Sequence, residues 1–591
     1  MATQLNQAIV VASPRDTVQV TFVEGFTLEG PVGATIEAFL RAAEPQFPLP
    51  YDSPIMGAVL DGRLRELSFC VARDSTLQPV LLSSSDGGRI YRRSLVMLLA
   101  TAVEELWPKA RVNVSYSVSE GGFYCTLLNH GPLAEAELAQ LERHMRAIVA
   151  EDAPIDKALV SLEDALKLFE SRGEDDKLRL LEQRTRNDLT LYTLHGRSDY
   201  FYGYMLPSTG SLTVFRLVRA GDGFILQYPR KENPAELAPV ETDSKINEVF
   251  RQADAWLGKL HVEDIGQLNR IVRRDRIQEL VLVAEALHEQ RIASIASEIS
   301  QRHDAQGTRI VLIAGPSSSG KTTFSKRLAI QLLAHGLRPF TLEMDNYFVD
   351  RDLTPRDESG AMDFDSLGAV NVPLFNKQLV ELTRGDEVRL PRFDFVLGQS
   401  LDGRLVQLAE NQIIIIEGIH GLNPNLLPSL PRESLFRIYV SALTPLNVDL
   451  HNRVPTTDTR LLRRMVRDAA YRGHLATDTL VRWPSVRRGE KRNIFPHQEN
   501  ADIIFNSALV YELAALRPLA EPLLLQVPPQ TPAHIEANRL LSFLKWVQPM
   551  TPEQVALIPD TSLLREFIGG SILADYHPGN LSTEETEAVV E

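Results

Sequence analysis

The feature that most constrains this chain is the stretch VLIAGPSSSGKTTF, which covers residues 311–324. A short apolar, β-rich run leads into the loop GPSSSGKT, and the amphipathic run TFSKRLAIQLLAHG follows and ends at Gly336. A strand, a glycine-rich turn and a helix in this order gather backbone N–H groups and the positive end of a helix dipole at one point. The spacing of the loop is that of a phosphate-binding loop, so the sequence predicts a nucleotide phosphate site. Strands and helices alternate from 309 to about 525, which predicts a parallel α/β sheet behind it.

The residue types of the loop indicate how it would hold a nucleotide. We expect Lys321 to reach the β and γ oxygens and the Thr322 hydroxyl to ligate Mg²⁺. The expected nucleotide contacts are Gly315, Pro316, Ser317, Ser318, Ser319, Gly320, Lys321, Thr322 and Thr323. A chance match in a glycine-serine turn is the alternative, and the full motif in its strand–helix context argues against it.

Two acids follow further predicted strands of the same sheet. Asp345 comes just after PFTLEM, and Glu417 ends the isoleucine run of NQIIIIEGIHGL. Ligands of open α/β sheets bind at this carboxyl edge. Asp345 could accept the proton of an attacking hydroxyl, or it could cap a helix or ligate Mg²⁺ only. Glu417 has the position of an acid that holds Mg²⁺ directly or through water, with a solvated strand-end glutamate as the alternative.

The segment DTRLLRRMVRDAAYRG predicts a helix from near Asp458 to Gly473. Its arginines recur at i, i+3, i+4 and i+7 and so share one face: Arg460, Arg463, Arg464 and Arg467. Guanidiniums without matching acids would repel one another unless an anion binds, so the hypothesis is a lid that closes over phosphate. A solvated charged face is the alternative. A second basic patch, SVRRGEKR at 485–492, extends the lid, contacts a substrate phosphate or is simply exposed; these three readings stay open.

Length and composition limit the remaining possibilities. A chain of 591 residues is too long for one core, and three or four domains are expected. The formal net charge of −15 argues against a bulk nucleic-acid binder, while a local basic face stays compatible with it. The two cysteines, Cys70 and Cys125, exclude a disulfide framework and fit a reducing, cytoplasmic location. No apolar run reaches membrane-spanning length and no signal peptide is expected at the N-terminus, so no membrane partner is expected.

From about 309 to 525 the chain resembles the uridine kinase and phosphoribulokinase family. The matching motifs are GPSSSGKTT, MDNYF, DFDS, PRFDF, IIIIEGIHGL and DTRLLRRMVRD, in the family's order and spacing. The resemblance implies ATP-dependent phosphorylation of a hydroxyl with Mg²⁺ and with Asp345 as the base. It places Asp365 at the ribose hydroxyls of the acceptor and the first lid arginines at phosphates. It also places three aromatic residues around the acceptor base: Phe364, Phe393 and Phe395.

Two departures from the family leave the acceptor open. Nucleoside-specific members carry a Tyr where this chain has Phe393, and a His that contacts the pyrimidine where it has Gly398. Losing a hydrogen bond of this kind lowers discrimination by orders of magnitude. The expected activity is a phosphotransferase acting on a uridine- or cytidine-like alcohol. The alternatives are a phosphoribulokinase-like sugar phosphate acceptor, and a nucleotide-switched RNA-binding or regulatory protein with little turnover.

The N-terminal half resembles a different family. Residues 17–73 are similar to the TGS module of threonyl-tRNA synthetases, and residues 76–230 to the editing domain of the same enzymes. That editing site uses a His-x-x-x-His pair and a later Cys and His. The matching positions here are Arg93, Met97, Phe201 and Met205. These residues do not replace imidazole and thiolate, so editing of mischarged tRNA is not expected. An RNA contact through this half and a homo-oligomer remain open.

The predicted fold is therefore multidomain, with α+β modules followed by an α/β phosphate-loop domain. The expected divisions are a TGS-like β-grasp domain (1–75), an editing-like second additional domain (76–235), a helical connector (236–305), a uridine kinase-like domain (306–530), and a C-terminal helical segment with an acidic tail (531–591).

Overall fold

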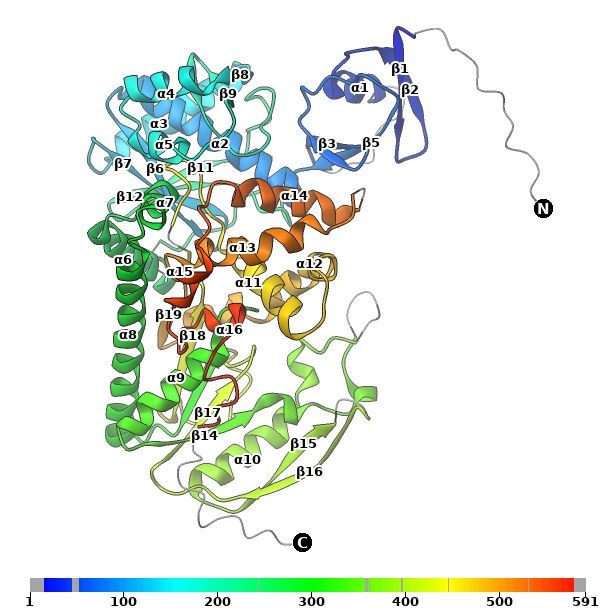
Figure 1. The fold of residues 1–591 in the computed structure, drawn as a ribbon. Coiled ribbons are helices and arrows are strands. Elements are labelled where there is room, and N and C mark those ends of the chain that lie inside the picture. Colours follow the sequence, from blue (N-terminus) through cyan, green and yellow to red (C-terminus); the bar gives the residue numbers. More distant parts are fainter. Residues whose placement is uncertain are drawn as a thin grey trace, which may run out of the picture.

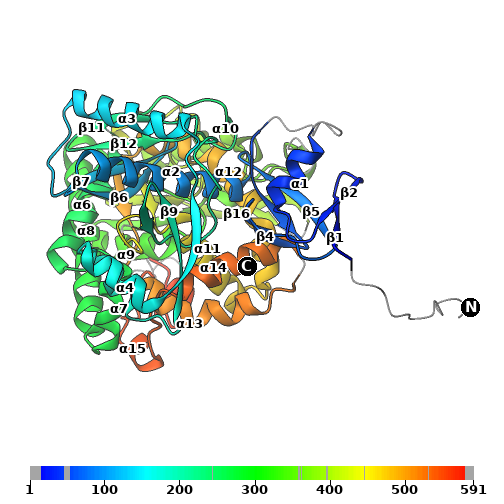
Figure 2. The same cartoon turned by 90° about the horizontal axis from the view of Figure 1, so that it is seen from above.

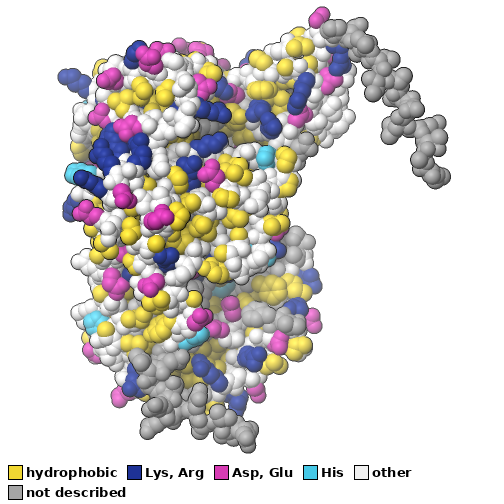
Figure 3. All heavy atoms as spheres, viewed as in Figure 1, with side chains coloured by type: hydrophobic (Ala, Val, Ile, Leu, Met, Phe, Trp, Pro, Cys, Tyr) yellow, Lys and Arg dark blue, Asp and Glu magenta, His cyan; other side chains and the backbone are white. Residues whose placement is uncertain are grey.

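The computed structural model describes residues 15–44, 53–242, 244–356, 360, 362–394, 397–444, 446–529 and 531–578. The N-terminal module forms a lobe to one side of the remaining described chain in both views (Figures 1 and 2). The same lobe stands out in the space-filling view, where Lys and Arg side chains are interspersed with Asp and Glu over the main body (Figure 3). Within the described residues, no helix is both long enough and apolar enough to cross a membrane.

The N-terminal lobe is a five-stranded mixed sheet covered by one helix. Its elements are β1 (Thr17–Phe22), β2 (Thr27–Pro31), α1 (Ile36–Ala43), β3 (Ile55–Leu60), β4 (Arg63–Arg65) and β5 (Ser75–Leu81). The sheet order is β2-β1-β5-β3-β4, with β1 and β5 parallel. Val18, Val20 and Phe22 alternate inward along β1 and pack under α1, as the period of two predicts. The turn at Asp61 and Gly62 joins β3 and β4 into an antiparallel pair.

The second region is built around a long helix. Its elements are α2 (Ser85–Leu106), β6 (Arg111–Val118), β7 (Gly122–Leu128), α3 (Glu135–Ala150), β8 (Asp156–Ser161), α4 (Leu162–Ser171), α5 (Asp175–Leu181), β9 (Asp188–Leu194), β10 (Arg197–Asp199), β11 (Arg216–Ala220) and β12 (Gly223–Gln227). They form two antiparallel sheets, β11-β12-β7-β6 and β10-β9-β8. The sequence predicts an amphipathic α2, but residues 94–103 of this helix are all buried, because α3, β6, β3 and β9 pack around it.

Three helices lead from this region to the phosphate loop: α6 (Lys245–Leu260), α7 (Ile265–Arg273) and α8 (Ile277–Gln306). The helical segment expected here is observed. Helix α8 packs along α9 through Ile292, Ile295, Ala296 and Ile299, one stripe at helical spacing. It ends at Gly307, whose φ of +75° is a left-handed cap.

The next region is a parallel sheet with helices on both faces. Its elements are β13 (Ile310–Ala314), α9 (Lys321–Ala334), β14 (Arg338–Glu343), α10 (Val372–Arg384), β15 (Val388–Asp394), β16 (Gln399–Val406), β17 (Gln412–Glu417), β18 (Leu435–Ser441), α11 (Thr456–Tyr471), α12 (Ala476–Asn493), β19 (Ile503–Asn506) and α13 (Glu512–Leu525). The order is β14-β17-β13-β18-β19, and every pair is parallel. All of β13 and residues 413–416 of β17 are buried, as expected of central parallel strands. The predicted parallel sheet is confirmed.

The C-terminal segment belongs to the core of the molecule. It contains α14 (Pro532–Leu544), α15 (Pro552–Ala556) and α16 (Arg565–Ile568). Helix α14 packs on α12 and α13, and α16 packs on α11. Leu564 and Phe567 of α16 are fully buried in the same apolar cluster as α11. The helical segment is as predicted, and the acidic tail from 579 lies outside the described residues.

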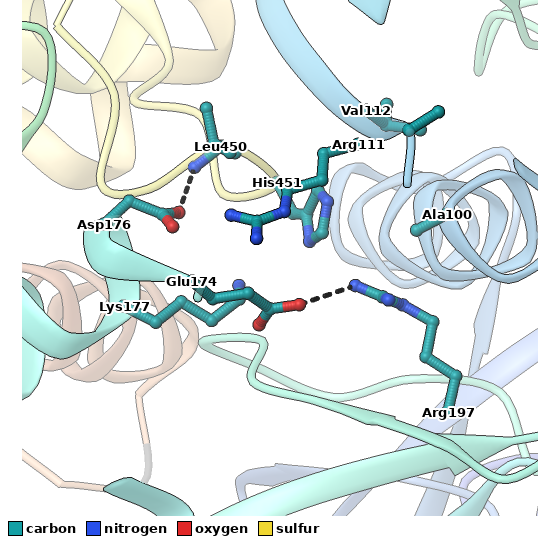
Figure 4. A pocket seen from close by; sticks show the side chains of 10 residues that line it. Ala100, Arg111, Val112, Glu174, Asp176, Lys177, Arg197, Leu450 and His451 are labelled. Atoms are coloured by element: carbon teal, nitrogen blue, oxygen red, sulfur yellow. Dashed lines mark hydrogen bonds and ion pairs between the residues drawn. The ribbon is translucent and has the colours of Figure 1, made fainter. Parts of the chain in front are cut away.

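A buried ionic network joins the editing-like region to the loop before α11. Lys177 lies 2.8 Å from Asp199 and 3.5 Å from Asp449, and His451 hydrogen-bonds Asp199 at 2.8 Å. The network borders a cavity of about 20 Å³, room for roughly one water molecule, shown in Figure 4. The Asn447 amide adds a bond to the Val114 carbonyl at 2.8 Å. The two halves therefore share buried polar contacts.

Candidate nucleotide and acceptor site

The phosphate loop lies between β13 and α9, where the sequence predicts it. A Cβ on Gly315 would meet the Val440 carbonyl oxygen at 2.0 Å, so no side chain fits there. Gly320 caps α9 with a φ of +86°, and Ser318 is also left-handed at +57°. The hydroxyls of Ser318 and Ser319 are buried without a hydrogen-bond partner among the described residues. A tight loop with unsatisfied hydroxyls at a helix N-terminus fits an anionic ligand.

Lys321 and Thr322 follow the loop at the first turn of α9. The Lys321 ammonium donates to the Gly315 and Pro316 carbonyls at 3.0 and 3.3 Å, so it folds back over the loop. Burial lowers the pKa of Lys321, while the charge of Glu417 opposes this change. The Thr322 hydroxyl donates to the Glu417 carboxylate at 3.0 Å.

The Thr322–Glu417 pair fits the expected Mg²⁺ ligands. It brings together one hydroxyl and one carboxylate oxygen, the hard donors that Mg²⁺ prefers, with the other positions left to water and substrate phosphate. Burial raises the pKa of Glu417, and Lys321 counteracts the rise. No group of three or more His, Cys, Asp or Glu residues suited to a metal occurs within the described part of the chain. A Mg²⁺ ion here would therefore take most of its ligands from water and from the nucleotide.

Asp345 lies at the same edge of the sheet, in a 3-10 turn (Met344–Tyr347) that directly follows β14. Its side chain is exposed and so accessible to an acceptor. The protein packed around it nevertheless raises the pKa of its carboxyl, and the charge of Glu343 adds to the rise. Asp345 also contributes to the raised pKa of Glu417, which places the two carboxylates near each other. The position suits a base whose proton affinity is higher than that of an ordinary aspartate.

The predicted unpaired arginine stripe of α11 is wrong, because each of its arginines has an acidic or carbonyl partner. Arg460 is buried, pairs with Glu490 of α12, and donates to the Ser317 carbonyl at 3.0 Å. Arg464 donates to the Ser317 hydroxyl at 2.8 Å and pairs with Asp468. These two arginines do lie on the phosphate loop, as the lid hypothesis requires.

The other two arginines of α11 have different positions. Arg463 is fully buried and bonds the Glu512 carboxylate at 2.5 Å and the Ser507 carbonyl at 2.8 Å. Arg467 pairs with Asp468 at 2.8 Å. Glu512 is 49 positions further along the chain, so the spacing along α11 could not reveal it. Arg463 is a core residue of the α11–α13 packing, so the expectation that it binds nucleotide is wrong.

Glu490 is a residue of the loop surroundings that the sequence did not single out. Its carboxylate accepts the Ser317 backbone N–H at 2.9 Å and also pairs with Arg460 and Arg487. It belongs to the second basic patch, where Arg492 pairs with Asp363 at 3.0 Å and Lys491 pairs with Glu232. The patch is therefore tied to neighbouring acids through α12. The basic run in the sequence concealed an acid that contacts the loop.

The expected acceptor residues lie beside α12. Gly489 of α12 approaches Asp365 so closely that a Cβ there would lie 2.8 Å from its carboxylate. Asp365 is an exposed residue. The protein packed around its carboxyl raises the pKa of this group, and the charge of Asp363 adds to the rise. Phe348, which the sequence did not single out, packs edge-on against both Phe364 (6.3 Å) and Phe393 (5.7 Å).

Phe364 is exposed whereas Phe393 is buried, so the aromatic group presents one open ring. Phe395, the third predicted aromatic, lies outside the described residues. Gly398 has a φ of +71°, and a Cβ there would lie 2.8 Å from the Arg351 side chain. A histidine at this position would therefore be strained in this chain.

The editing-like positions contain no polar cluster. Met97, Phe201 and Met205 are buried together in one apolar core. Arg93 donates to the Tyr204 carbonyl at 2.8 Å, and burial lowers its pKa to about 10. The side chains that replace the editing residues thus fill the site with core packing.

Comparisons with known proteins agree with both resemblances. Residues 310–514 match the family model described as "Phosphoribulokinase / Uridine kinase family". The N-terminal part matches threonine–tRNA ligases; the ligase of Burkholderia lata is 35% identical over 170 residues, which are 29% of this chain and 27% of the ligase. The chain thus spans about 27% of the length of this curated relative.

Two solved structures match part of this chain. A candidate fructose transport system kinase from Silicibacter sp. is 22% identical, with a TM-score of 0.26. The match covers 36% of this chain and 98% of the kinase. A protein described as a possible uridine kinase from Bacillus stearothermophilus is 19% identical, with a TM-score of 0.23. The match covers 34% of this chain and 89% of that protein. Both TM-scores are low, so neither neighbour bears on the function.

Proposed function

We propose that this protein is an ATP-dependent kinase that transfers the γ-phosphate of ATP to a hydroxyl of a small nucleoside-like acceptor. The observation that carries the proposal is the meeting of three groups at one edge of the parallel sheet: the phosphate loop with Lys321, the Thr322–Glu417 pair, and Asp345. The family match over 310–514 supports it.

Each group has one task in the proposed reaction. Lys321 leaves the loop carbonyls and binds the β and γ oxygens. Thr322 and Glu417 would hold Mg²⁺, which would neutralise charge on the phosphates. Asp345 accepts the proton of the acceptor hydroxyl as the oxygen bonds to the γ-phosphorus and the bond to the ADP oxygen breaks. Arg460 and Arg464 lie on the loop and stabilise the charge of the transferred group.

The acceptor region favours a nucleoside over a sugar phosphate. Asp365 offers a carboxylate for ribose hydroxyls, and the exposed Phe364 ring offers a stacking face. The basic patch that would suit a sugar phosphate is engaged by acids: Arg487 with Glu490 and Arg492 with Asp363. Phe393 has no hydroxyl, so stacking and shape contribute more to base recognition than hydrogen bonds do.

The test is transfer from γ-labelled ATP with Mg²⁺ to uridine, cytidine, other nucleosides, ribose and sugar phosphates. We expect labelled uridine or cytidine monophosphate. The variant Asp345→Asn should bind ATP normally and lose roughly 10²- to 10⁴-fold in transfer rate. The matched control is Asp352→Asn, an exposed aspartate of the following turn, which should keep full activity.

Three outcomes would contradict the proposal at different points. Full turnover by Asp345→Asn would remove its assignment as the base. Label on a sugar phosphate alone would change the acceptor class. ATP binding without transfer to any acceptor would leave a nucleotide-switched regulator as the function.

A further inference from the structure

The C-terminal segment contacts the phosphate loop at the place where a nucleotide would bind. The Glu566 carboxylate of α16 accepts the backbone N–H of Thr323 at 3.3 Å and the Thr323 hydroxyl at 2.9 Å. Thr323 lies in the first turn of α9, where backbone N–H groups have no partner within the helix. In a phosphate loop these N–H groups bind phosphate oxygens. One N–H group does not serve a carboxylate and a phosphate fully at the same time.

Further contacts hold this segment against the loop. Leu563 is fully buried, and one of its methyl groups would lie 2.8 Å from a Cβ on Gly320. Lys326 of α9 donates to the Leu573 and Ala574 carbonyls at 2.7 and 2.8 Å. Phe567 packs under the Arg463 guanidinium at 5.1 Å. The backbone of α16 is therefore fixed, and Glu566 is held at the loop by packing on both sides of it.

The charge of Glu566 also acts on the predicted catalytic groups. Burial lowers the pKa of Lys321 and the charge of Glu566 opposes this change, whereas burial raises the pKa of Glu417 and the charge of Glu566 adds to the rise. The Glu566 carboxylate therefore lies within electrostatic reach of both groups. Glu490 also acts on Lys321, but the Glu490 carboxylate is paired with Arg460 and Arg487. Among the described residues, no arginine or lysine is paired with Glu566. Its negative charge therefore opposes an incoming polyphosphate.

We infer that Glu566 is an affinity-determining residue of the nucleotide site: its carboxylate competes with nucleotide phosphate for the first turn of α9 and leaves by side-chain rotation when nucleotide binds. The inference rests on the proposed nucleotide site. A rotation is sufficient because Leu563, Leu564 and Phe567 keep the backbone of the segment buried in the core. The C-terminal segment thereby sets the nucleotide concentration at which the site is half occupied.

The test is calorimetric titration of the full chain with Mg-ADP, which the reaction does not consume, and with inorganic pyrophosphate. Glu566→Gln keeps the shape and the ability to accept from Thr323 but removes the charge. We expect it to bind both probes roughly tenfold more tightly than the wild-type chain. Glu566→Ala removes the acceptor as well and should bind at least as tightly. The matched control Glu553→Gln, at the exposed start of α15, should leave both affinities unchanged.

Unchanged or weaker binding by both Glu566 variants, in a chain whose wild type binds Mg-ADP, would overturn the inference and leave the proposed nucleotide site intact. Thermal unfolding of each variant shows whether it is folded. Absence of Mg-ADP binding in the wild type and in all variants would instead contradict the nucleotide site, and this inference with it. Pyrophosphate makes no adenosine contacts. Tighter binding of pyrophosphate by the variants would therefore show that the gain in affinity arises at the phosphates.

Discussion

At the scale of the residue, Asp345 shows how position changes chemistry. The protein packed around this exposed residue raises the pKa of its carboxyl above the ordinary value of 3.8, and the charge of Glu343 adds to the rise. The folded chain therefore binds a proton more readily than the unfolded chain, so this group favours folding most at low pH and opposes it as pH rises through the raised pKa. The same shift makes Asp345 a better proton acceptor near neutral pH.

The prediction at this scale concerns pH. We expect kcat/KM to fall on the acid side with an apparent pKa above 3.8, because Asp345 must be deprotonated to act. Asp345→Asn should raise the unfolding temperature at pH 7 and leave it nearly unchanged at pH 3, where the wild-type carboxyl is protonated. Rate profiles and thermal unfolding at both pH values check this. If kcat/KM fell on the acid side with an apparent pKa at or below 3.8, the assignment of Asp345 as the base would be contradicted.

At the scale of the element, α11 combines core packing and contact with the phosphate loop on one charged face. Arg463 is buried against Glu512, whereas Arg464 is half-buried and reaches the Ser317 hydroxyl of the loop. Removing one member of a buried pair leaves an uncompensated charge, which costs about 3–5 kcal/mol. These two adjacent arginines have different contacts, so their removal should have different effects.

We therefore predict that Arg463→Ala lowers the free energy of unfolding by about 3–5 kcal/mol, whereas Arg464→Ala mainly weakens ATP binding. Chemical unfolding and nucleotide titration of both variants separate the two effects. Arg472→Ala, at the exposed end of the helix, is the control and should change stability by less than about 1 kcal/mol. Equal loss of stability in the Arg463 and Arg464 variants would refute the division.

At the scale of the whole molecule, Lys177 joins the editing-like region to the loop that leads into α11. Burial alone would lower the pKa of Lys177, but Asp199 and Asp449 raise it well above its usual value. Burial alone would raise the pKa of Asp199, but Lys177 and His451 hold it well below its usual value. The favourable contribution of Asp199 is therefore present at neutral pH and is lost as pH falls through its lowered pKa.

Lys177→Met should lower the free energy of unfolding by about 3–5 kcal/mol, because it removes the cation beside the buried Asp449 and one of the cations beside the buried Asp199. We expect faster hydrogen exchange on both sides of the contact, in residues 197–202 and 447–454. Lys167→Met, on the exposed face of α4, removes a surface ion pair and should change stability by less than about 1 kcal/mol. Faster exchange confined to one side would mean that the network does not couple the two halves.

The sequence by itself determined the parts of this protein that depend on local order. The parallel strands, the phosphate loop between β13 and α9, and the acids at the strand ends follow from short apolar runs and glycine spacing. The loss of the editing residues follows from residue type, since Met97, Phe201 and Met205 can fill only an apolar core.

Only the tertiary structure decided which charges meet. The partners of Arg460 and Arg463, Glu490 and Glu512, come from other helices, and an arginine pattern along α11 carries no trace of them. Glu566 meets Thr323 across 243 positions of the chain. Electrostatic contacts depend on distance in space, whereas periodicity reports only which face of an element is apolar. For that reason the contact of the C-terminal segment with the phosphate loop was not predictable from the sequence.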